Sequence, residues 1–203
     1  MKNIAVLLSG RGSNFKAIYN SIETGHIKNT RITAVVSNKA EAPGLQFAKD
    51  NGLNSYFVAP TQYKSREAYD TEIIDIMKSR GIDLVCLAGY MRLLSAKFVD
   101  TFKNRIINIH PSLLPAFPGL NAQKQALEYG VKISGCTVHF VDKELDHGPI
   151  ILQKAVEIKE NDTLNNVSER ILKEEHKIYP EAVRLFVENR LTVNNRKVNI
   201  DYS

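Results

Sequence analysis

The sequence predicts an α/β protein with a doubly wound, mostly parallel sheet and an antiparallel part near the C-terminus. Over the first hundred residues, short apolar segments alternate with helical ones, as in βαβ units. The most apolar of these segments have no polar side, as expected of strands covered on both faces. After residue 105 the alternation changes, and two strands joined by a charged loop indicate antiparallel pairing. With no linker or repeat, we expect one domain over 1–203, with a phosphate-binding, Rossmann-like half at 1–105 and a second half at 106–203.

Local patterns predict each element of the first half. The first helix, from about residue 14, places Phe15, Ile18 and Ile22 on one face at helical spacing. Ser65 is suited to cap a long helix that follows it. The expected strands are Ile4–Leu8, Ile32–Val36, Tyr56–Val58 and Leu84–Ala88, and the other expected helices are Gly44–Asn51 and Ser65–Arg80.

The second half begins with a strand and a proline-rich loop. We expect Pro180 to restart or kink the last helix, because proline lacks the N–H that a helix interior needs. The expected strands are Ile106–His110, Ser134–Val141 and Ile150–Val156, the expected helices are Asn121–Tyr129, Leu164–Ile178 and a continuation through Asn189, and Leu191–Val193 and Val198–Ile200 form a small hairpin.

Composition and charge argue against several classes of protein. With 203 residues, 43% of them hydrophobic and 24% charged, the chain can bury a core and is not typical of a disordered or coiled-coil protein. Lys and Arg number 27 against 22 for Asp and Glu, but no basic run favours a nucleic-acid partner. A surplus of this size suits a small anionic substrate.

No segment is expected to enter a membrane. The longest uncharged apolar run, Leu84–Met91, is far too short to span one, and the first residues are typical of a strand rather than a signal peptide. Cys86 and Cys136 lie in apolar segments without a Cys-x-x-Cys motif, as in reduced proteins. We therefore expect a cytoplasmic protein with buried thiols.

The loop Ser9–Asn14, of sequence SGRGSN, follows the first strand and opens the first helix. Small residues there allow backbone N–H groups to converge on an anion, so the loop is a candidate phosphate site. It is neither a Walker loop nor a good dinucleotide fingerprint, because Phe15 replaces the third glycine and no acid follows the second strand. The alternative is a tight turn with a Ser or Asn cap.

Asn108 and His110 are two residues apart on a predicted strand, so their side chains share one face at its carboxyl end. Ligands gather at such strand ends in open α/β sheets. Asp146, in the following charged loop, is the kind of group that orients an imidazole and favours its protonated form. The spacing does not show that Asp146 meets His110, and a lone strand histidine is more often a core residue.

The other histidines and the remaining motifs predict less. His139 is interpreted as a packing residue, and His147 has no identifiable partner. No His-Glu-x-x-His pair or Cys/His cluster predicts a metal, and no Gly-x-Ser-x-Gly motif predicts a serine hydrolase.

Six segments in this order closely resemble the phosphoribosylglycinamide formyltransferases, folate-dependent enzymes of purine (IMP) synthesis. The resemblance covers nearly the whole chain. The segments are SGRGSN at 9–14, LAGYMRLLS at 87–95, NIHPSLLPAFPG at 108–119, GCTVHFV at 135–141, ELDHGPIILQ at 144–153 and EHKIYP at 175–180.

The resemblance implies roles for individual residues. It implies a catalytic group of Asn108, His110 and Asp146, and ribonucleotide contacts from Gly12, Ser13, Asn14 and Glu175. It implies folate contacts from Arg66, Met91, Arg92, Leu93, Leu94, Asn108, Asp142, Lys143, Glu144, Leu145 and Asp146. Arg11 stands at a position that varies in the family, so the resemblance assigns it no role. Without the resemblance, several of these residues have a purely structural interpretation. The segment 91–94 could pack in the core, Arg66 could be a solvated residue in the first turn of a helix, and Glu175 could form a surface ion pair.

The implied reaction is formyl transfer from 10-formyltetrahydrofolate to the amine of 5-phosphoribosylglycinamide. Asn108 and protonated His110 stabilise the oxyanion of a tetrahedral intermediate, with support from Asp146, and no metal is needed. Residues 106–203 are then the catalytic and folate-binding half. Partners are the two small molecules, without nucleic acid or membrane, in a monomer or homodimer.

Three alternatives stay open. Methionyl-tRNA formyltransferase and formyltetrahydrofolate hydrolase share the Asn, His and Asp arrangement, but each normally carries an added domain for which this chain has no room. The phosphate loop also argues against hydrolysis. A non-catalytic phosphate-binding regulatory domain is the third, and it would give the set of Asn108, His110 and Asp146 no purpose.

Overall fold

The computed structural model describes all residues, Met1–Ser203, as two compact units, Met1–Ile107 and Asn108–Ser203. The α/β class, the mostly parallel sheet and the antiparallel C-terminal strands are confirmed. Strand β5 (Ile106–His110) begins at the end of the first unit and its last three residues open the second.

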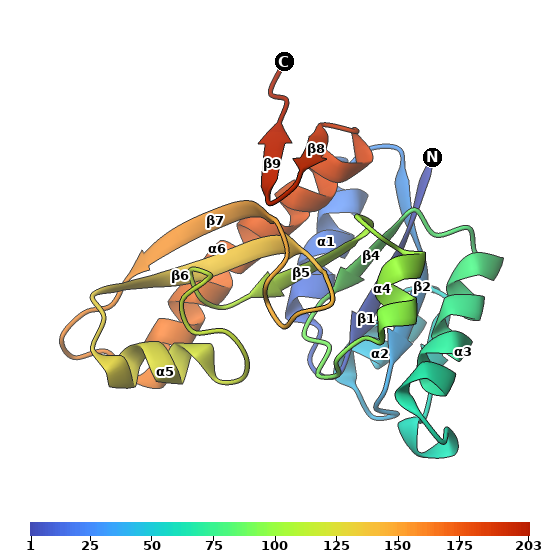
Figure 1. The fold of residues 1–203 in the computed structure, drawn as a ribbon, viewed down its shortest axis with the longest axis horizontal. Coiled ribbons are helices and arrows are strands. Elements are labelled where there is room, and N and C mark those ends of the chain that lie inside the picture. Colours follow the sequence, from blue (N-terminus) through green and yellow to red (C-terminus); the bar gives the residue numbers. More distant parts are fainter. The chain divides into compact units, whose positions relative to one another are not determined.

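The first unit is a parallel sheet with strand order β3-β2-β1-β4 (Figure 1). The chain runs outward from β1 through β2 to β3 and then crosses back to β4 on the other side of β1. The loops that follow β1 and β4 therefore diverge, and ligands bind at such a switch point in open α/β sheets. Ile4 to Leu8 are completely buried. The elements are β1 (Lys2–Leu8), α1 (Ser13–Glu23), β2 (Thr30–Ser37), α2 (Pro43–Asp50), β3 (Ser55–Phe57), η1 (Pro60–Gln62), α3 (Arg66–Ser79), β4 (Leu84–Leu87) and α4 (Ala96–Thr101).

The second unit continues from β5 into a hairpin and a long helix. Strands β6 and β7 pair antiparallel, with Thr137 opposite Gln153, as the charged loop between them predicts. The C-terminal hairpin is also confirmed, and its second strand joins β7. The elements are α5 (Ala122–Tyr129), β6 (Ile133–Phe140), β7 (Ile150–Glu157), α6 (Leu164–Val187), β8 (Leu191–Asn194) and β9 (Lys197–Ile200).

The expectation that Pro180 restarts the last helix is wrong. Helix α6 runs without a break from Leu164 to Val187 with Pro180 inside it. A proline in a helix interior costs about 3 kcal/mol. Buried residues on both sides, including Ile171, Tyr179 and Val183, hold the helix against the core and offset that cost.

Helix α4 and the short 3₁₀ helix η1 have no counterpart in the sequence analysis. Helix α4 depends on its cap, because the Ser95 hydroxyl accepts a hydrogen bond from the Phe98 N–H. The N–H of Ser95 in turn donates to the buried carboxylate of Asp70 on α3. Burial raises the pKa of Asp70, more than its bond from Ser95 lowers it.

An ion pair fixes the N-terminal end of α6. Arg170 donates to both carboxylate oxygens of Asp162, at 2.7 and 2.8 Å, and this bond lowers the pKa of Asp162 to about 2. Because the folded pKa lies below the ordinary value of 3.8, the pair stabilises the protein above pH 4 and loses this effect as the pH falls toward 2.

We therefore expect Asp162→Asn to lower the Tm at pH 6 and to lower it less at pH 2.5. Thermal unfolding of both proteins across this range measures the difference. Asp75→Asn, at an exposed position of α3, is the matched control. A loss of Tm that is equal at every pH would contradict the assignment.

Both cysteines are buried and unpaired, one in each unit. Burial raises the pKa of the Cys86 thiol well above its usual range and raises that of Cys136 to about 12.

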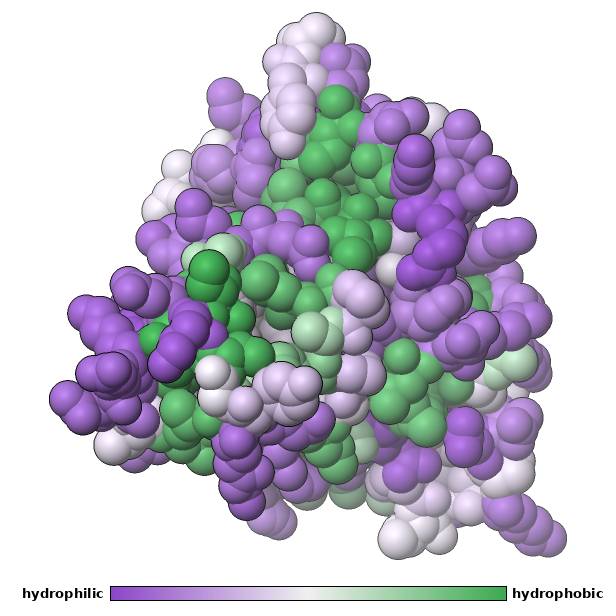
Figure 2. Space-filling view, turned by 60° about the vertical axis from the view of Figure 1, so that its left-hand side comes forward, coloured by the Kyte–Doolittle hydropathy of each residue, from purple (hydrophilic) through white to green (hydrophobic).

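No helix has the length and apolar character needed to cross a membrane. On the face shown in Figure 2, hydrophobic residues form separate patches bordered by hydrophilic ones.

Candidate active site

The phosphate loop is shaped by its glycines. Gly12 is the N-cap of α1 and has φ of 69°, a left-handed conformation that favours glycine. A Cβ there would lie 3.0 Å from the Gly44 Cα, so α1 and α2 approach too closely for a side chain. Gly12 also has no side-chain oxygen to cap α1, so the alternative of a Ser or Asn N-cap is wrong. The N-terminus of α1 therefore has no side-chain cap, and such a helix end is suited to bind an anion.

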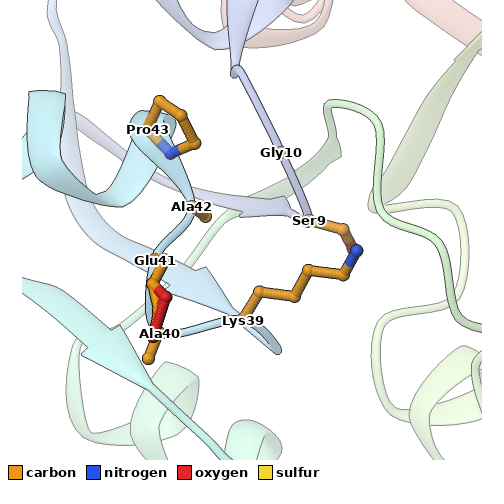
Figure 3. Close-up of a pocket in the computed structure, with 7 residues that line it drawn as sticks. All are labelled: Ser9, Gly10, Lys39, Ala40, Glu41, Ala42 and Pro43. Carbon is orange, nitrogen blue, oxygen red and sulfur yellow. The ribbon is translucent and has the colours of Figure 1, made fainter.

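Beside the loop lies a cavity of about 350 Å³ (Figure 3). It is lined by Ser9 and Gly10 at the end of β1 and by residues 39–43 between β2 and α2. The side chain of Lys39 extends toward Ser9 in this view and brings a positive charge to the cavity. Glu41 also lines the cavity, so its wall carries one positive and one negative charge. Of these two side chains, Lys39 is the one suited to an anionic ligand.

The segment 91–94 is tied to the phosphate loop. The Ser9 hydroxyl accepts a hydrogen bond from the Met91 N–H at 2.8 Å and donates to the side chain of Asn38 at 2.6 Å. The side chain of Met91 is 63% exposed and that of Leu93 is 54% exposed. Core packing is therefore excluded as the role of these two side chains, although Leu94 is half-buried.

Two arginines of the first unit differ in their surroundings. The guanidinium of Arg92 lies 4.6 Å from the centre of the Tyr69 ring, a cation–π contact, and its Nε is buried without a hydrogen-bond partner. Arg66 is exposed as the first residue of α3, where a positive charge is unfavourable for the helix dipole. Arg92 therefore contributes a contact to the fold, whereas the exposed position of Arg66 leaves its side chain in water.

The structure brings Asp146 to His110. The Asp146 carboxylate lies 3.3 Å from Nδ1 of His110, and both side chains are nine-tenths buried. Asp146 has φ of 50°, and its Oδ2 also accepts the Gly119 N–H at 2.8 Å, which holds the carboxylate in place. The other ring nitrogen, Nε2, lies 2.9 Å from the carbonyl oxygen of Phe117.

Both ring nitrogens of His110 therefore face groups that only accept hydrogen bonds. A carbonyl oxygen and an ionised carboxylate cannot donate, so only a ring that carries a hydrogen on each nitrogen could donate to both of them. The arrangement is suited to a protonated His110 with Asp146 as its counter-ion.

The structure adds a second histidine to this site. Nε2 of His139 lies 3.2 Å from Nδ2 of Asn108 and 3.8 Å from the Asp146 carboxylate. His139 is buried on β6, as the interpretation of it as a packing residue predicts, and it also contacts Asn108 and Asp146. No sequence signal identified it, since its position depends on which strand pairs beside β5.

The loop Asp142–Gly148 is held by its own side chains and by the C-terminal hairpin. Nδ1 of His147 lies 2.8 Å from the Asp142 carboxylate. Arg196, in the β8–β9 turn, donates to the backbone oxygen of His147 at 2.8 Å and to its Nε2 at 2.9 Å. His147 thus has two partners that the sequence analysis did not identify. Lys143, Glu144 and Leu145 lie between these anchored positions, and the Leu145 side chain is 55% exposed.

Glu175 is buried on α6, 6% exposed, so a surface ion pair is excluded. After burial itself, it is the largest influence that raises the pKa of the neighbouring Cys136 thiol. Glu175 belongs to the second unit with Asn108, His110 and Asp146, whereas Gly12, Ser13, Asn14 and Arg66 belong to the first. No group of three or more His, Cys, Asp or Glu side chains is placed to hold a metal ion.

An open α/β sheet with an imidazole, a carboxamide and a carboxylate clustered at a strand end is typical of an enzyme. The family model described as formyl transferase matches residues 2–183. The chain belongs to the formyl transferase family.

Two similar proteins are, by their names, a phosphoribosylglycinamide formyltransferase and a glycinamide ribonucleotide transformylase. The chain is 44% identical to phosphoribosylglycinamide formyltransferase of Escherichia coli strain K12 over 199 residues. This match covers 98% of the chain and 93% of that protein. The crystal structure of glycinamide ribonucleotide transformylase 1 from Symbiobacterium toebii has a TM-score of 0.96 and 52% identity, covering 98% of this chain and 94% of that one.

The fold is also similar to that of a formyltetrahydrofolate deformylase from Pseudomonas syringae. That structure has a TM-score of 0.90 at 27% identity, and the match covers 98% of this chain but only 65% of that one. The fold alone therefore does not separate transfer from hydrolysis.

Proposed function

We propose that the protein transfers a formyl group from 10-formyltetrahydrofolate to the amine of 5-phosphoribosylglycinamide, in purine synthesis in the cytoplasm. The chain is 44% identical to a phosphoribosylglycinamide formyltransferase over nearly its full length, which supports this reaction. Its sequence identity to the deformylase is lower, at 27%. The observation that favours catalysis over mere binding is the buried imidazole of His110, held between the Asp146 carboxylate and the Phe117 carbonyl oxygen. Both substrates are small molecules, and the protein acts as a monomer or homodimer.

In this proposal the first unit holds the ribonucleotide phosphate. Gly12, Ser13 and Asn14 lie at the N-terminus of α1, which has no side-chain cap, and the positive charge of Lys39 lies at the adjoining cavity. Glu175 takes part by facing the amine and ribose. The exposed side chains of Met91 and Leu93, together with Arg66, Arg92 and Leu94, contact the folate. An apolar ring system would cover the two side chains that the fold leaves in water.

The chemistry lies with Asn108, His110 and Asp146. The neutral amine attacks the formyl carbon that N10 of the folate carries, and the formyl oxygen becomes an oxyanion. Asn108 donates an N–H to this oxyanion, and His110 donates from Nε2, so the oxyanion replaces the Phe117 carbonyl as acceptor. When N10 leaves, His110 supplies its proton, and the proton of the attacking amine returns to the imidazole or to water.

The loop Asp142–Gly148 closes one side of the folate site in this proposal. We expect Arg196→Ala to raise the KM for 10-formyltetrahydrofolate about tenfold or more, because it removes two hydrogen bonds that anchor the loop and each one contributes about 1 kcal/mol. The KM for the ribonucleotide should change little. Steady-state kinetics of Arg196→Ala beside Lys197→Ala, its neighbour in the hairpin, test this. Equal effects of the two substitutions would contradict it.

The first experiment is to measure folate release from 10-formyltetrahydrofolate by absorbance, with and without 5-phosphoribosylglycinamide. Release that requires the ribonucleotide and yields formylated product supports the proposal. Release without it favours the hydrolase, for which water replaces the amine. Absence of release with folded protein would instead favour a phosphate-binding regulatory domain.

A further inference from the structure

His139 is a buried titratable group that the proposed chemistry leaves without a task. It lies on β6 with 2% of its surface exposed, in contact with two of the residues assigned to catalysis. Its Nδ1 lies 2.8 Å from the carbonyl oxygen of Phe140. Its Nε2 points toward the Nδ2 atom of Asn108 at 3.2 Å.

The contact with Phe140 selects the tautomer. A carbonyl oxygen only accepts hydrogen bonds, so Nδ1 of His139 carries a hydrogen and donates it. Burial lowers the pKa of His139, and this effect exceeds the opposing ones of the Phe140 bond and the Asp146 charge. The ring is therefore neutral, and Nε2 presents a lone pair.

This lone pair decides which way the Asn108 amide points. With Nδ2 toward Nε2, one amide hydrogen makes the bond and the second remains free to donate elsewhere. With the amide turned over, Oδ1 would face Nε2 and two acceptors would oppose each other. Losing a buried hydrogen bond in this way disfavours the flipped amide by roughly tenfold to a hundredfold.

We infer that His139 is a positioning residue, which accepts a hydrogen bond from Asn108 and so keeps the amide nitrogen of Asn108 turned toward the oxyanion. The inference rests on the proposed function, because the oxyanion belongs to the proposed transfer. Its chemical requirement is narrow: an acceptor must stand where Nε2 stands. Glutamine can supply one through its Oε1, and leucine cannot.

Kinetics of His139→Leu and His139→Gln test this, with His26→Gln in the α1–β2 connection as control. We expect His139→Leu to lower kcat about a hundredfold, since a misplaced oxyanion donor costs this much. Both KM values should stay within about threefold, because binding contacts are retained. His139→Gln should keep kcat within about tenfold of wild type. Full kcat in His139→Leu, or equal losses in both variants, would overturn the inference.

A second measurement does not depend on a folded leucine variant or on the reaction. Nitrogen NMR of ¹⁵N-histidine-labelled wild type, with His139→Gln used to assign the signal, reports which ring nitrogen is protonated. We expect a protonated Nδ1 and an unprotonated Nε2 at neutral pH. A protonated Nε2 would overturn the inference even if the transfer is confirmed. If wild type shows no ribonucleotide-dependent release, the proposed function fails, while this tautomer is still tested.

Discussion

Replacing His110 by alanine is expected to lower kcat about a thousandfold, because the substitution removes both an oxyanion donor and the general acid. The ring is 5% exposed, with the Phe117 carbonyl oxygen 2.9 Å from Nε2 and the Asp146 carboxylate 3.3 Å from Nδ1. Both KM values should change far less than kcat, since His110 acts on the transition state. Steady-state and single-turnover rates, with His26→Ala as control, measure the effect.

Asp146→Asn separates charge from shape at the same site. Asparagine retains an oxygen that can accept the Gly119 N–H, but it lacks the negative charge that stabilises a protonated His110. We expect kcat to fall about a hundredfold or more while ribonucleotide binding is kept. Asp75→Asn, on the exposed side of α3, should match wild type. Near wild-type turnover in Asp146→Asn would show that the catalytic assignment is wrong.

The second large effect is expected at the phosphate loop, for Ser13→Asp. An acidic residue at the first position of α1 is favourable for the helix dipole, so the fold should hold. The same charge repels a bound phosphate: two unit charges about 4 Å apart interact by about 4 kcal/mol at an effective dielectric constant of 20. We expect the ribonucleotide KM to rise at least about a hundredfold, with the folate KM nearly unchanged.

Ser13→Asn is the matched control, because it has the same shape as the aspartate variant without the charge. It should stay close to wild type in both KM values. Isothermal titration with the ribonucleotide gives the affinity independently of turnover. If both variants lose affinity equally, bulk rather than charge matters, and the phosphate lies elsewhere.

The elements of the fold that the sequence predicts well are those with strong local signals. The apolar segment Ile4–Leu8 and the helix that begins beside it are found close to their expected positions. Helix α4 was not predicted, because six residues contain too little periodicity and its cap is held by the distant Asp70. Pro180 misleads for a similar reason: packing of both halves of α6 outweighs a local helix-breaking signal.

The candidate site was predictable only in part. Asn108 and His110 share a strand face, which period-two geometry reveals. That Asp146 meets His110 needed the resemblance, since the two are far apart in sequence. The contacts of His139 and Arg196 depend on strand order and on the packing of the C-terminal hairpin, and no local pattern encodes either. The domain halves and the individual residue roles stay predictions.

Because both thiols are buried, the rate at which a reagent labels them measures how often the folded protein opens. A thiol reagent attacks the thiolate, which is scarce when a thiol is buried and its pKa is raised, so the folded chain should be labelled very slowly. Cys86 and Cys136 belong to different compact units. Mass spectrometry of the labelled peptides would therefore time the opening of each unit separately and reveal whether they unfold together or in succession.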